Sequence, residues 1–292
     1  MATARAVTVL TLGEGRELAF AELGTPDGTP VFGFHGTPGS HRQIAIVAEA
    51  ARAVGVRLLA PDRPGYGEST YDAARRLADW PKDVEAIARH LGLARFGVFG
   101  VSGGGPHAAV CAHAFGDRLL GAAIVSGVAP GDAPGFTAGM MRMNRLNFGL
   151  AKRSALLVRP LMSLVVFGGR HFSERAQDAM LRGLPEADRR VLSRPEIAQS
   201  FRADLRALSR TAARAAAQDF HLFARPWGFR LEDVAVPVHV WQGDADVNVP
   251  VSHGQFQAAR IPKAQLHLCR GEGHMLFIDR AAEILRAAAG RN

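Results

Sequence analysis

Short apolar runs alternate with longer amphipathic segments along most of this chain. The apolar runs predict strands at residues 6–12, 17–23, 31–34, 56–60, 96–99, 120–125, 236–241 and 265–269. Helical segments lie between them from the third run onward, at residues 40–54, 79–91, 103–115, 252–260 and 275–289. This alternation is typical of a mostly parallel sheet with helices on both faces. The pattern therefore predicts an α/β fold.

The strand pattern stops between residues 131 and 230. Arginine, alanine, leucine and methionine dominate this segment, and glycine or proline interrupts it at 168–169, 183–185 and 194–195. We predict several helices that form a cap, or lid, inserted into the fold. The remaining residues, 1–130 and 231–292, then form one core domain, which a chain of 292 residues is long enough to build.

The positive charge of the chain is concentrated in the same segment. The net charge is +8, but residues 131–230 hold 17 basic and 8 acidic residues, against 18 and 19 elsewhere. Arg202, Arg206, Arg210 and Arg214 recur every fourth residue and predict one basic ridge along a helix. A solvated helix face explains such a ridge, and attraction of an anionic substrate, an acidic partner or a membrane surface is the alternative. The sequence has no basic module interleaved with aromatic residues, which disfavours nucleic acid as a partner.

The remaining bulk features favour a cytoplasmic protein. The longest stretch without a formal charge, residues 96–116, contains six glycines, a proline and two histidines, so we expect no integral membrane association. The only cysteines, Cys111 and Cys269, fit no metal-binding or redox spacing. We expect both to be buried small residues in a reducing compartment, and no metal site.

A single G-x-S-x-G motif, residues 100–104, lies between the strand at 96–99 and the helix at 103–115. A serine on such a sharp turn is held clear of its own backbone, which exposes its oxygen for nucleophilic attack. The flanking glycines avoid clashes within the strained turn. Ser102 is therefore the candidate nucleophile.

A serine hydroxyl needs a base, and the base needs an orienting carboxylate. The loop after the strand at 236–241 contains Asp244 and Asp246, and the loop after the last strand ends in His274. The chain order serine, acid, histidine suits a catalytic triad on this fold. We assign His274 as the base and prefer Asp246 as the acid, with Asp244 as the alternative.

Acyl transfer also requires hydrogen-bond donors for the developing oxyanion. The backbone N–H of Gly103, just after the nucleophile, is one candidate. The glycine- and proline-rich loop at 34–40 follows the third strand, and the N–H of Thr37 in this loop is the second. Candidate residues of the substrate pocket lie in this loop and at the start of the 131–230 segment, where methionine adapts to varied shapes: His35, Met140, Met141 and Phe148.

These motifs resemble those of the α/β-hydrolase superfamily over essentially the full chain outside residues 131–230. The matching segments are 35–39, 62–69, 100–104, 243–246 and 273–274. The resemblance implies an eight-stranded, mostly parallel sheet, a helical cap inserted after strand 6, and no cofactor. The serine nucleophile disfavours the members with an aspartate nucleophile, namely haloalkane dehalogenases and epoxide hydrolases. His-Gly-Thr-Pro-Gly at 35–39 is similar to the His-Gly-Gly-Pro-Gly of proline iminopeptidases but differs at Thr37.

We therefore predict a serine hydrolase that cleaves small carboxylic esters through an acyl-enzyme on Ser102. Activity is expected to rise with pH as His274 becomes neutral, around the ordinary histidine pKa of ~6.5. The alternatives on the same triad are a carbon–carbon bond hydrolase, a proline iminopeptidase-like peptidase and a perhydrolase. The basic segment argues against the peptidase, which needs acidic groups for a free amine. A ligand receptor that hardly turns over is the alternative from another class, and a homo-oligomer is left open.

Overall fold

The computed structural model describes residues 7–291, whose strands form one sheet. The strands are β1 (Thr8–Thr11), β2 (Glu17–Gly24), β3 (Thr29–Phe34), β4 (Val56–Pro61), β5 (Phe96–Val101), β6 (Leu119–Val125), β7 (Val238–Gly243) and β8 (Ala264–Cys269). Their spatial order is β1-β2-β4-β3-β5-β6-β7-β8, and β2 runs antiparallel to both of its neighbours. The central strands are nearly continuous apolar runs because both sheet faces are covered. The predicted eight-stranded, mostly parallel sheet is confirmed.

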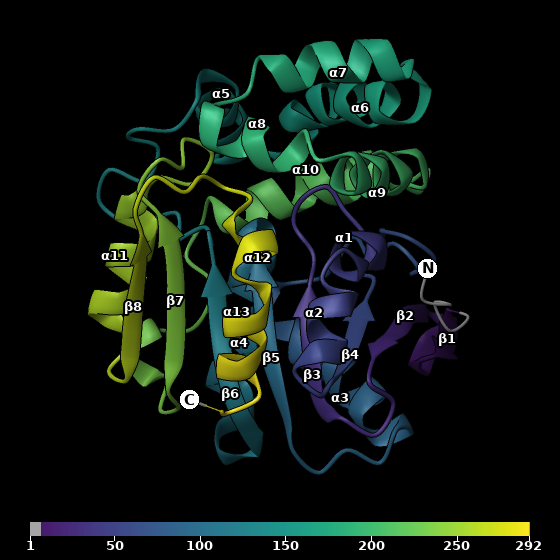
Figure 1. Ribbon diagram of the computed structural model, residues 1–292, viewed down its shortest axis with the longest axis vertical. Helices are drawn as coiled ribbons and strands as arrows, with labels where there is room; N and C mark the ends of the chain where they lie inside the picture. Colours follow the sequence, from purple (N-terminus) through teal and green to yellow (C-terminus); the bar gives the residue numbers. More distant parts are fainter. Residues whose placement is uncertain (1–6, 292) are drawn as a thin grey trace.

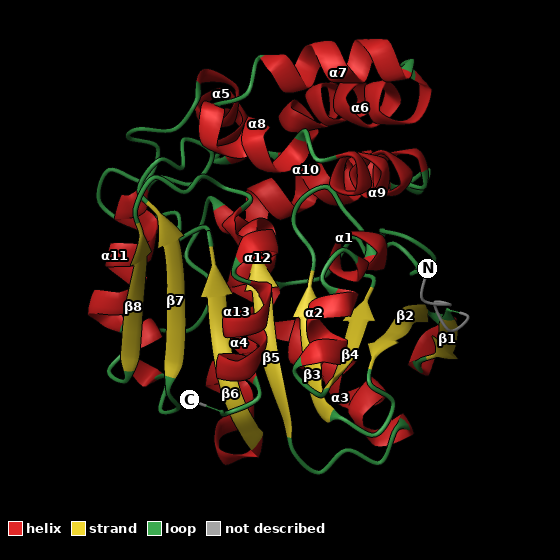
Figure 2. Ribbon diagram, in the orientation of Figure 1, coloured by secondary structure: helices red, strands yellow, loops and turns green. Residues whose placement is uncertain are grey.

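Helices cover both faces of this sheet (Figures 1 and 2). On one face lie α3 (Trp80–His90), α4 (Gly105–Phe115) and α11 (Val251–Arg260). On the other lie α1 (His41–Ala45), α2 (Ala48–Ala53), α12 (Leu276–Asp279) and α13 (Ala281–Ala288). Each face has its own buried apolar core, so the fold has three layers around two cores.

Six further helices stand between β6 and β7 in the chain. They are α5 (Arg142–Ala151), α6 (Ala155–His171), α7 (Glu174–Arg182), α8 (Glu186–Leu192), α9 (Pro195–Arg206) and α10 (Ala212–Phe223). This upper helical layer lies beyond the carboxyl ends of the parallel strands (Figure 1) and has a core of its own, to which Phe148, Val158 and Phe223 contribute. The predicted helical insertion after strand 6 is confirmed. Among the described residues, no helix has the length and apolar character needed to cross a membrane.

Two predicted helices are broken in the structure. The helix expected at 40–54 is divided into α1 and α2 at Ile46 and Val47, and Val47 is buried in the same core as Ile44. The helix expected at 275–289 is divided into α12 and α13 around Arg280. The first strand is shorter than predicted, and Ala6, where it was expected to begin, lies outside the described residues.

The predicted basic ridge was wrong. Arg202 and Arg206 belong to α9, which ends at Arg206, whereas Arg214 belongs to α10. Two hydroxyl groups of the connection, those of Ser209 and Thr211, donate to the Gly65 carbonyl at 2.7 and 2.8 Å. These bonds hold the connection between α9 and α10 against the loop at Gly65.

The arginines of the expected ridge are also engaged separately. Arg202 pairs with Asp178, and Arg206 pairs with Glu174 at 3.1 Å. The Arg214 guanidinium lies over the Tyr71 ring at 4.2 Å. No continuous basic face therefore forms along these positions.

Candidate active site

Ser102 stands on a tight turn between β5 and α4. Its φ of +56° lies in the left-handed region, and a short 3-10 turn over Ser102–Gly104 joins the strand to the helix. A Cβ at Gly100 would collide with the Gly104 carbonyl oxygen, and a Cβ at Gly104 would collide with that of Phe34. The strand–turn–helix context required of a G-x-S-x-G nucleophile is therefore present, with the Ser102 side chain half-buried.

His274 and Asp246 are joined by a hydrogen bond between the loops after β8 and β7. His274 Nδ1 lies 2.8 Å from Asp246 Oδ2, and both side chains are buried. Asp246 Oδ1 accepts from the N–H groups of Asn248 and Val249 at 2.8 and 2.9 Å. Its Oδ2 also accepts from Gln242 Nε2 at 3.3 Å. These donors hold the carboxylate in a fixed orientation, with Oδ2 toward the His274 ring.

The alternative acid, Asp244, takes no part in this arrangement. Its side chain is exposed, and its Oδ1 accepts from the Gly271 N–H at 2.7 Å. The geometry therefore pairs His274 with Asp246 and leaves Asp244 to brace the loop that precedes the histidine.

The surroundings of His274 favour its protonated form. Burial opposes the charge, but the Asp246 carboxylate, the hydrogen bond to it and the more distant Asp188 together raise the pKa of His274 above its ordinary value. Within residues 7–291, no hydrogen bond joins the Ser102 hydroxyl to His274. Catalytic hydrogen bonds are often long without substrate and tighten only in the substrate complex.

The loop after β3 runs beside Ser102. A Cβ at Gly36 would lie 3.4 Å from the Ser102 Cβ, and a Cβ at Gly103 would collide with the Thr37 side chain. The Gly36 N–H already donates to Gln43 Oε1 at 2.5 Å. The Thr37 N–H donates to no protein group in the described chain, so it is free for a substrate oxygen.

A buried charge network that the sequence analysis missed supports this loop. Asp219 of α10 is fully buried, and its Oδ2 accepts from the Thr37 hydroxyl, Arg63 and the Tyr66 hydroxyl, each at 2.8 Å. Its Oδ1 accepts from Arg75 at 2.6 Å. Burial disfavours the charge of Asp219, but the Arg75 and Arg63 charges outweigh this effect and hold its pKa below the ordinary range.

Arg63 extends the network to the loop backbone. Its guanidinium donates to the carbonyl oxygens of His35 and Gly36 at 2.5 and 3.1 Å and to the Thr37 hydroxyl at 2.8 Å. The upper helical layer is thus tied to the candidate oxyanion loop through Asp219. The available signal was a single carboxylate in the alanine-rich stretch around 212–220.

A second missed carboxylate, Asp188 of α8, lies against the histidine loop. It is buried, its Oδ1 accepts from the Met275 N–H at 2.9 Å, and a Cβ at Gly273 would collide with it. Burial raises the pKa of Asp188 above its ordinary value. No local sequence pattern marks Asp188, because its contact with residues 273–275 arises only in the folded chain.

The four predicted pocket residues occupy different places. His35 is fully buried, with Nδ1 2.8 Å from the Gly36 carbonyl oxygen and Nε2 accepting from the Arg63 N–H at 3.2 Å. Burial and the Arg63 charge lower its pKa well below the ordinary value, so its neutral ring supports the loop. Met140 and Phe148 lie in the core of the upper layer. Met141 is half-buried, and its N–H donates to the Val247 carbonyl at 2.8 Å.

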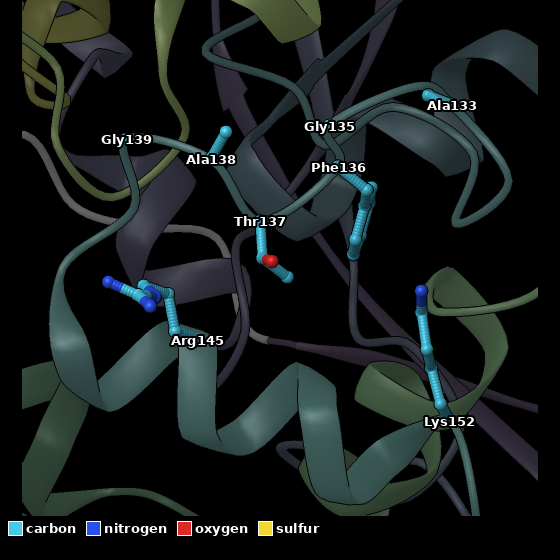
Figure 3. A pocket seen from close by; sticks show the side chains of 8 residues that line it. All are labelled: Ala133, Gly135, Phe136, Thr137, Ala138, Gly139, Arg145 and Lys152. Carbon is cyan, nitrogen blue, oxygen red and sulfur yellow. The ribbon is translucent and has the colours of Figure 1, made fainter.

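A cavity of about 480 Å³ lies between the loop at 133–139 and α5. Figure 3 shows next to it the side chains of Arg145, on α5, and of Lys152, just after the end of α5. The side chains of Ser102, Asp246 and His274 do not line it. This cavity is therefore separate from the candidate catalytic residues.

The fold and the loops around Ser102 agree with a comparison of the whole chain against protein families. A model of the α/β hydrolase fold family matches residues 29–281, and the chain belongs to this family.

Solved structures of the same fold match nearly the whole chain. An α/β hydrolase fold protein from Nakamurella multipartita is 25% identical, with 97% of this chain and 99% of that chain covered and a TM-score of 0.67. A hydrolase from Pseudomonas aeruginosa is 19% identical, with 96% of each chain covered and a TM-score of 0.70. An esterase from Thermogutta terrifontis is 23% identical, with 97% and 96% covered and a TM-score of 0.65. Among curated proteins, none has a sequence that matches this chain significantly.

Proposed function

We propose that this protein is a serine hydrolase that cleaves small carboxylic esters through an acyl-enzyme on Ser102. The nucleophile is Ser102, the base is His274 and the orienting acid is Asp246. The N–H groups of Thr37 and Gly103 stabilise the oxyanion. Membership of the α/β hydrolase fold family supports hydrolase activity, and the similarity to the Thermogutta terrifontis esterase supports an ester substrate.

The reaction follows from the roles of these groups. His274 Nε2 takes the proton of the Ser102 hydroxyl as Oγ attacks the ester carbonyl carbon. The carbonyl oxygen gains negative charge and accepts hydrogen bonds from the two N–H groups. The protonated His274 then donates its proton to the alkoxide as the carbon–oxygen bond breaks. Water, deprotonated by His274, attacks the acyl carbon. The protonated His274 then returns the proton to Ser102 Oγ as the acyl–oxygen bond breaks, which releases the carboxylic acid and the free serine.

The observation that carries this proposal is the 2.8 Å hydrogen bond between His274 Nδ1 and Asp246 Oδ2. It selects the tautomer that leaves Nε2 without a proton, which is the form a base requires. The positive φ of Ser102 is the second support, because backbone strain of this kind is concentrated at functional sites.

The upper helical layer is proposed to act as a cap, formed by residues 131–230, over a core formed by residues 1–130 and 231–292. Its support is the contact of Asp219 and Asp188 with the loops at Thr37 and Met275. Two free, buried cysteines, Cys111 and Cys269, support a cytoplasmic location.

Steady-state hydrolysis of p-nitrophenyl esters of short and medium chain length tests the proposal. Ser102→Ala should lower kcat by about a millionfold, the effect of removing the serine of such a triad. Ser126→Ala is a matched control, because Ser126 directly follows β6 with a φ of +46° and has a buried hydroxyl that finds no partner among the described residues. We expect Ser126→Ala to retain activity.

Three results would contradict the proposal. Wild-type protein that fails to turn over any ester in the panel would favour a receptor. Faster turnover of anilides or of β-diketones would favour a peptidase or a carbon–carbon bond hydrolase. Equal loss of activity in the Ser102→Ala and Ser126→Ala variants would show that Ser102 has no special role.

A further inference from the structure

Helix α6 presents an apolar stripe to solvent. Leu156, Leu164 and Phe167 are 71%, 64% and 56% exposed, and Leu157 is 47% exposed. With the exposed Pro160, these residues fall within about 100° of the helix circumference at 3.6 residues per turn. The opposite side of α6, which includes Val158, Met162 and Val166, is buried in the core of the upper layer. We call the five exposed residues the α6 stripe.

Solvent exposure of this stripe is unusual for a helix that already buries one face. Surface leucines are ordinary when they are scattered, whereas a contiguous apolar patch marks an interaction site. In Figure 1, α6 lies in the upper helical layer, at the end of the molecule opposite the amino ends of the parallel strands. The exposed fractions of its side chains leave the stripe accessible to a partner.

The charges around the stripe have one sign. Between residues 133 and 173 the chain holds six basic residues and no acidic residue. The basic residues are Arg142, Arg145, Lys152, Arg153, Arg159 and Arg170. In the described part of the chain, none of the six forms an ion pair, and Glu174 and Asp178 of α7 pair instead with Arg206 and Arg202.

Two of these arginines flank the stripe directly. Arg159 and Arg170 fall on one border of the stripe by helical periodicity, and Lys152 and Arg153 lie in the turn between α5 and α6. An apolar face bordered by free cationic side chains is the pattern of helices that lie in the headgroup region of a membrane. The cations interact with anionic headgroups while the apolar side chains enter the acyl boundary.

From this geometry we propose that the α6 stripe docks the protein onto an anionic lipid bilayer surface. The proposal concerns a surface contact and does not depend on the ester hydrolysis proposed above. A second copy of this chain fits the stripe less well. Pairing two stripes would bring Arg159 and Arg170 of both copies to one interface, where residues 133–173 supply no acidic partner.

Vesicle flotation of the full-length protein tests the docking. Vesicles of pure phosphatidylcholine are compared with vesicles of equal parts phosphatidylcholine and phosphatidylglycerol. We expect binding to the anionic vesicles that weakens with added salt, and little binding to the neutral ones. Leu164→Glu with Phe167→Glu should weaken the binding by at least about tenfold. Arg159→Gln with Arg170→Gln should weaken it by about fivefold for each charge.

Leu266→Glu with Leu268→Glu provides the matched control. These two leucines lie on the edge strand β8, are 37% and 44% exposed, and undergo the same chemical change away from α6. Vesicle binding should be unchanged in this control. Circular dichroism and the thermal melting temperature, measured on each variant, verify that the fold is intact.

A fluorescence variant gives a second readout. The three native tryptophans are buried, so a Phe167→Trp variant adds an exposed reporter that keeps the apolar character of the stripe. We expect the tryptophan emission of this variant to shift to the blue on anionic vesicles, and the emission of the wild type to stay unchanged.

Absence of wild-type binding to anionic vesicles would overturn the proposal, as would equal binding by the Leu164→Glu, Phe167→Glu variant. A wild-type dimer that this double substitution dissociates, measured by light scattering without lipid, would overturn it in favour of a second copy.

Discussion

Asp219→Asn is the most informative perturbation of the buried network. The carboxylate of Asp219 accepts hydrogen bonds from Arg63, Arg75, Tyr66 and Thr37. Asparagine has nearly the same shape, but it has one acceptor oxygen and no charge. The substitution therefore leaves two buried guanidinium groups without a counter-charge. Removing one partner of a buried ion pair costs about 3–5 kcal/mol, and this is the loss of unfolding free energy that we expect at neutral pH.

The loss of unfolding free energy caused by Asp219→Asn should depend on pH in one direction. The pKa of Asp219 in the folded protein lies below its value in the unfolded chain. The stabilisation by its charge is therefore complete above the unfolded pKa of ~3.9 and is lost as the pH falls toward the folded pKa. The difference in unfolding free energy between wild type and Asp219→Asn should be constant at neutral pH and shrink in acid.

Asp204→Asn is a matched control that should change the free energy of unfolding in the opposite direction. Asp204 of α9 is also buried, but it has no arginine partner among the described residues, and burial raises its pKa to about 7. Its ionisation therefore destabilises the fold increasingly as the pH rises from the unfolded value to about 7. Asp204→Asn should be as stable as wild type in acid and more stable above neutral pH.

Urea unfolding of the three proteins across this pH range is the assay. A loss of 3–5 kcal/mol corresponds to a fall in melting temperature of about 10 °C for a chain of this size. An Asp219→Asn variant within about 1 kcal/mol of wild type at neutral pH would refute the reasoning, because the two arginines would then not need the carboxylate.

Three further predictions concern the catalytic groups. The midpoint of the pH–kcat/KM profile should lie above the ordinary histidine pKa of ~6.5, because Asp246 raises the pKa of His274, and a midpoint at or below that value would contradict the assignment. Thr37→Pro removes the free N–H and should raise the activation free energy of the kcat step by about 3–4 kcal/mol. Thr37→Ser keeps the N–H, and its kcat should stay near that of the wild type in the same ester assay. Asp188→Asn should shift the profile midpoint to lower pH without unfolding the protein; an unchanged midpoint would show that the Asp188 charge does not reach His274.

The hydrophobic pattern and the turn residues of the chain were sufficient to predict its architecture. Strands of nearly uniform apolar character, such as β5 and β6, are typical of central strands covered on both faces. The turn at Ser102 could be predicted from the glycines around it, because glycine alone fits positions 100 and 104. Asp246 and His274 were identified because each follows a predicted strand, and parallel strands bring their carboxyl ends to one edge of the sheet.

The long-range contacts were decided by the tertiary structure. Asp219 lies 156 residues from Arg63 along the chain, and no local pattern distinguishes its buried carboxylate from a solvated one. The four-residue arginine spacing predicted one ridge, but the chain breaks between α9 and α10, where Ser209 and Thr211 bond to the Gly65 carbonyl. The spacing of residues along a segment indicates the secondary structure that the segment favours in isolation. The partners that satisfy a buried charge or end a helix come from distant parts of the chain, so only the folded molecule determines them.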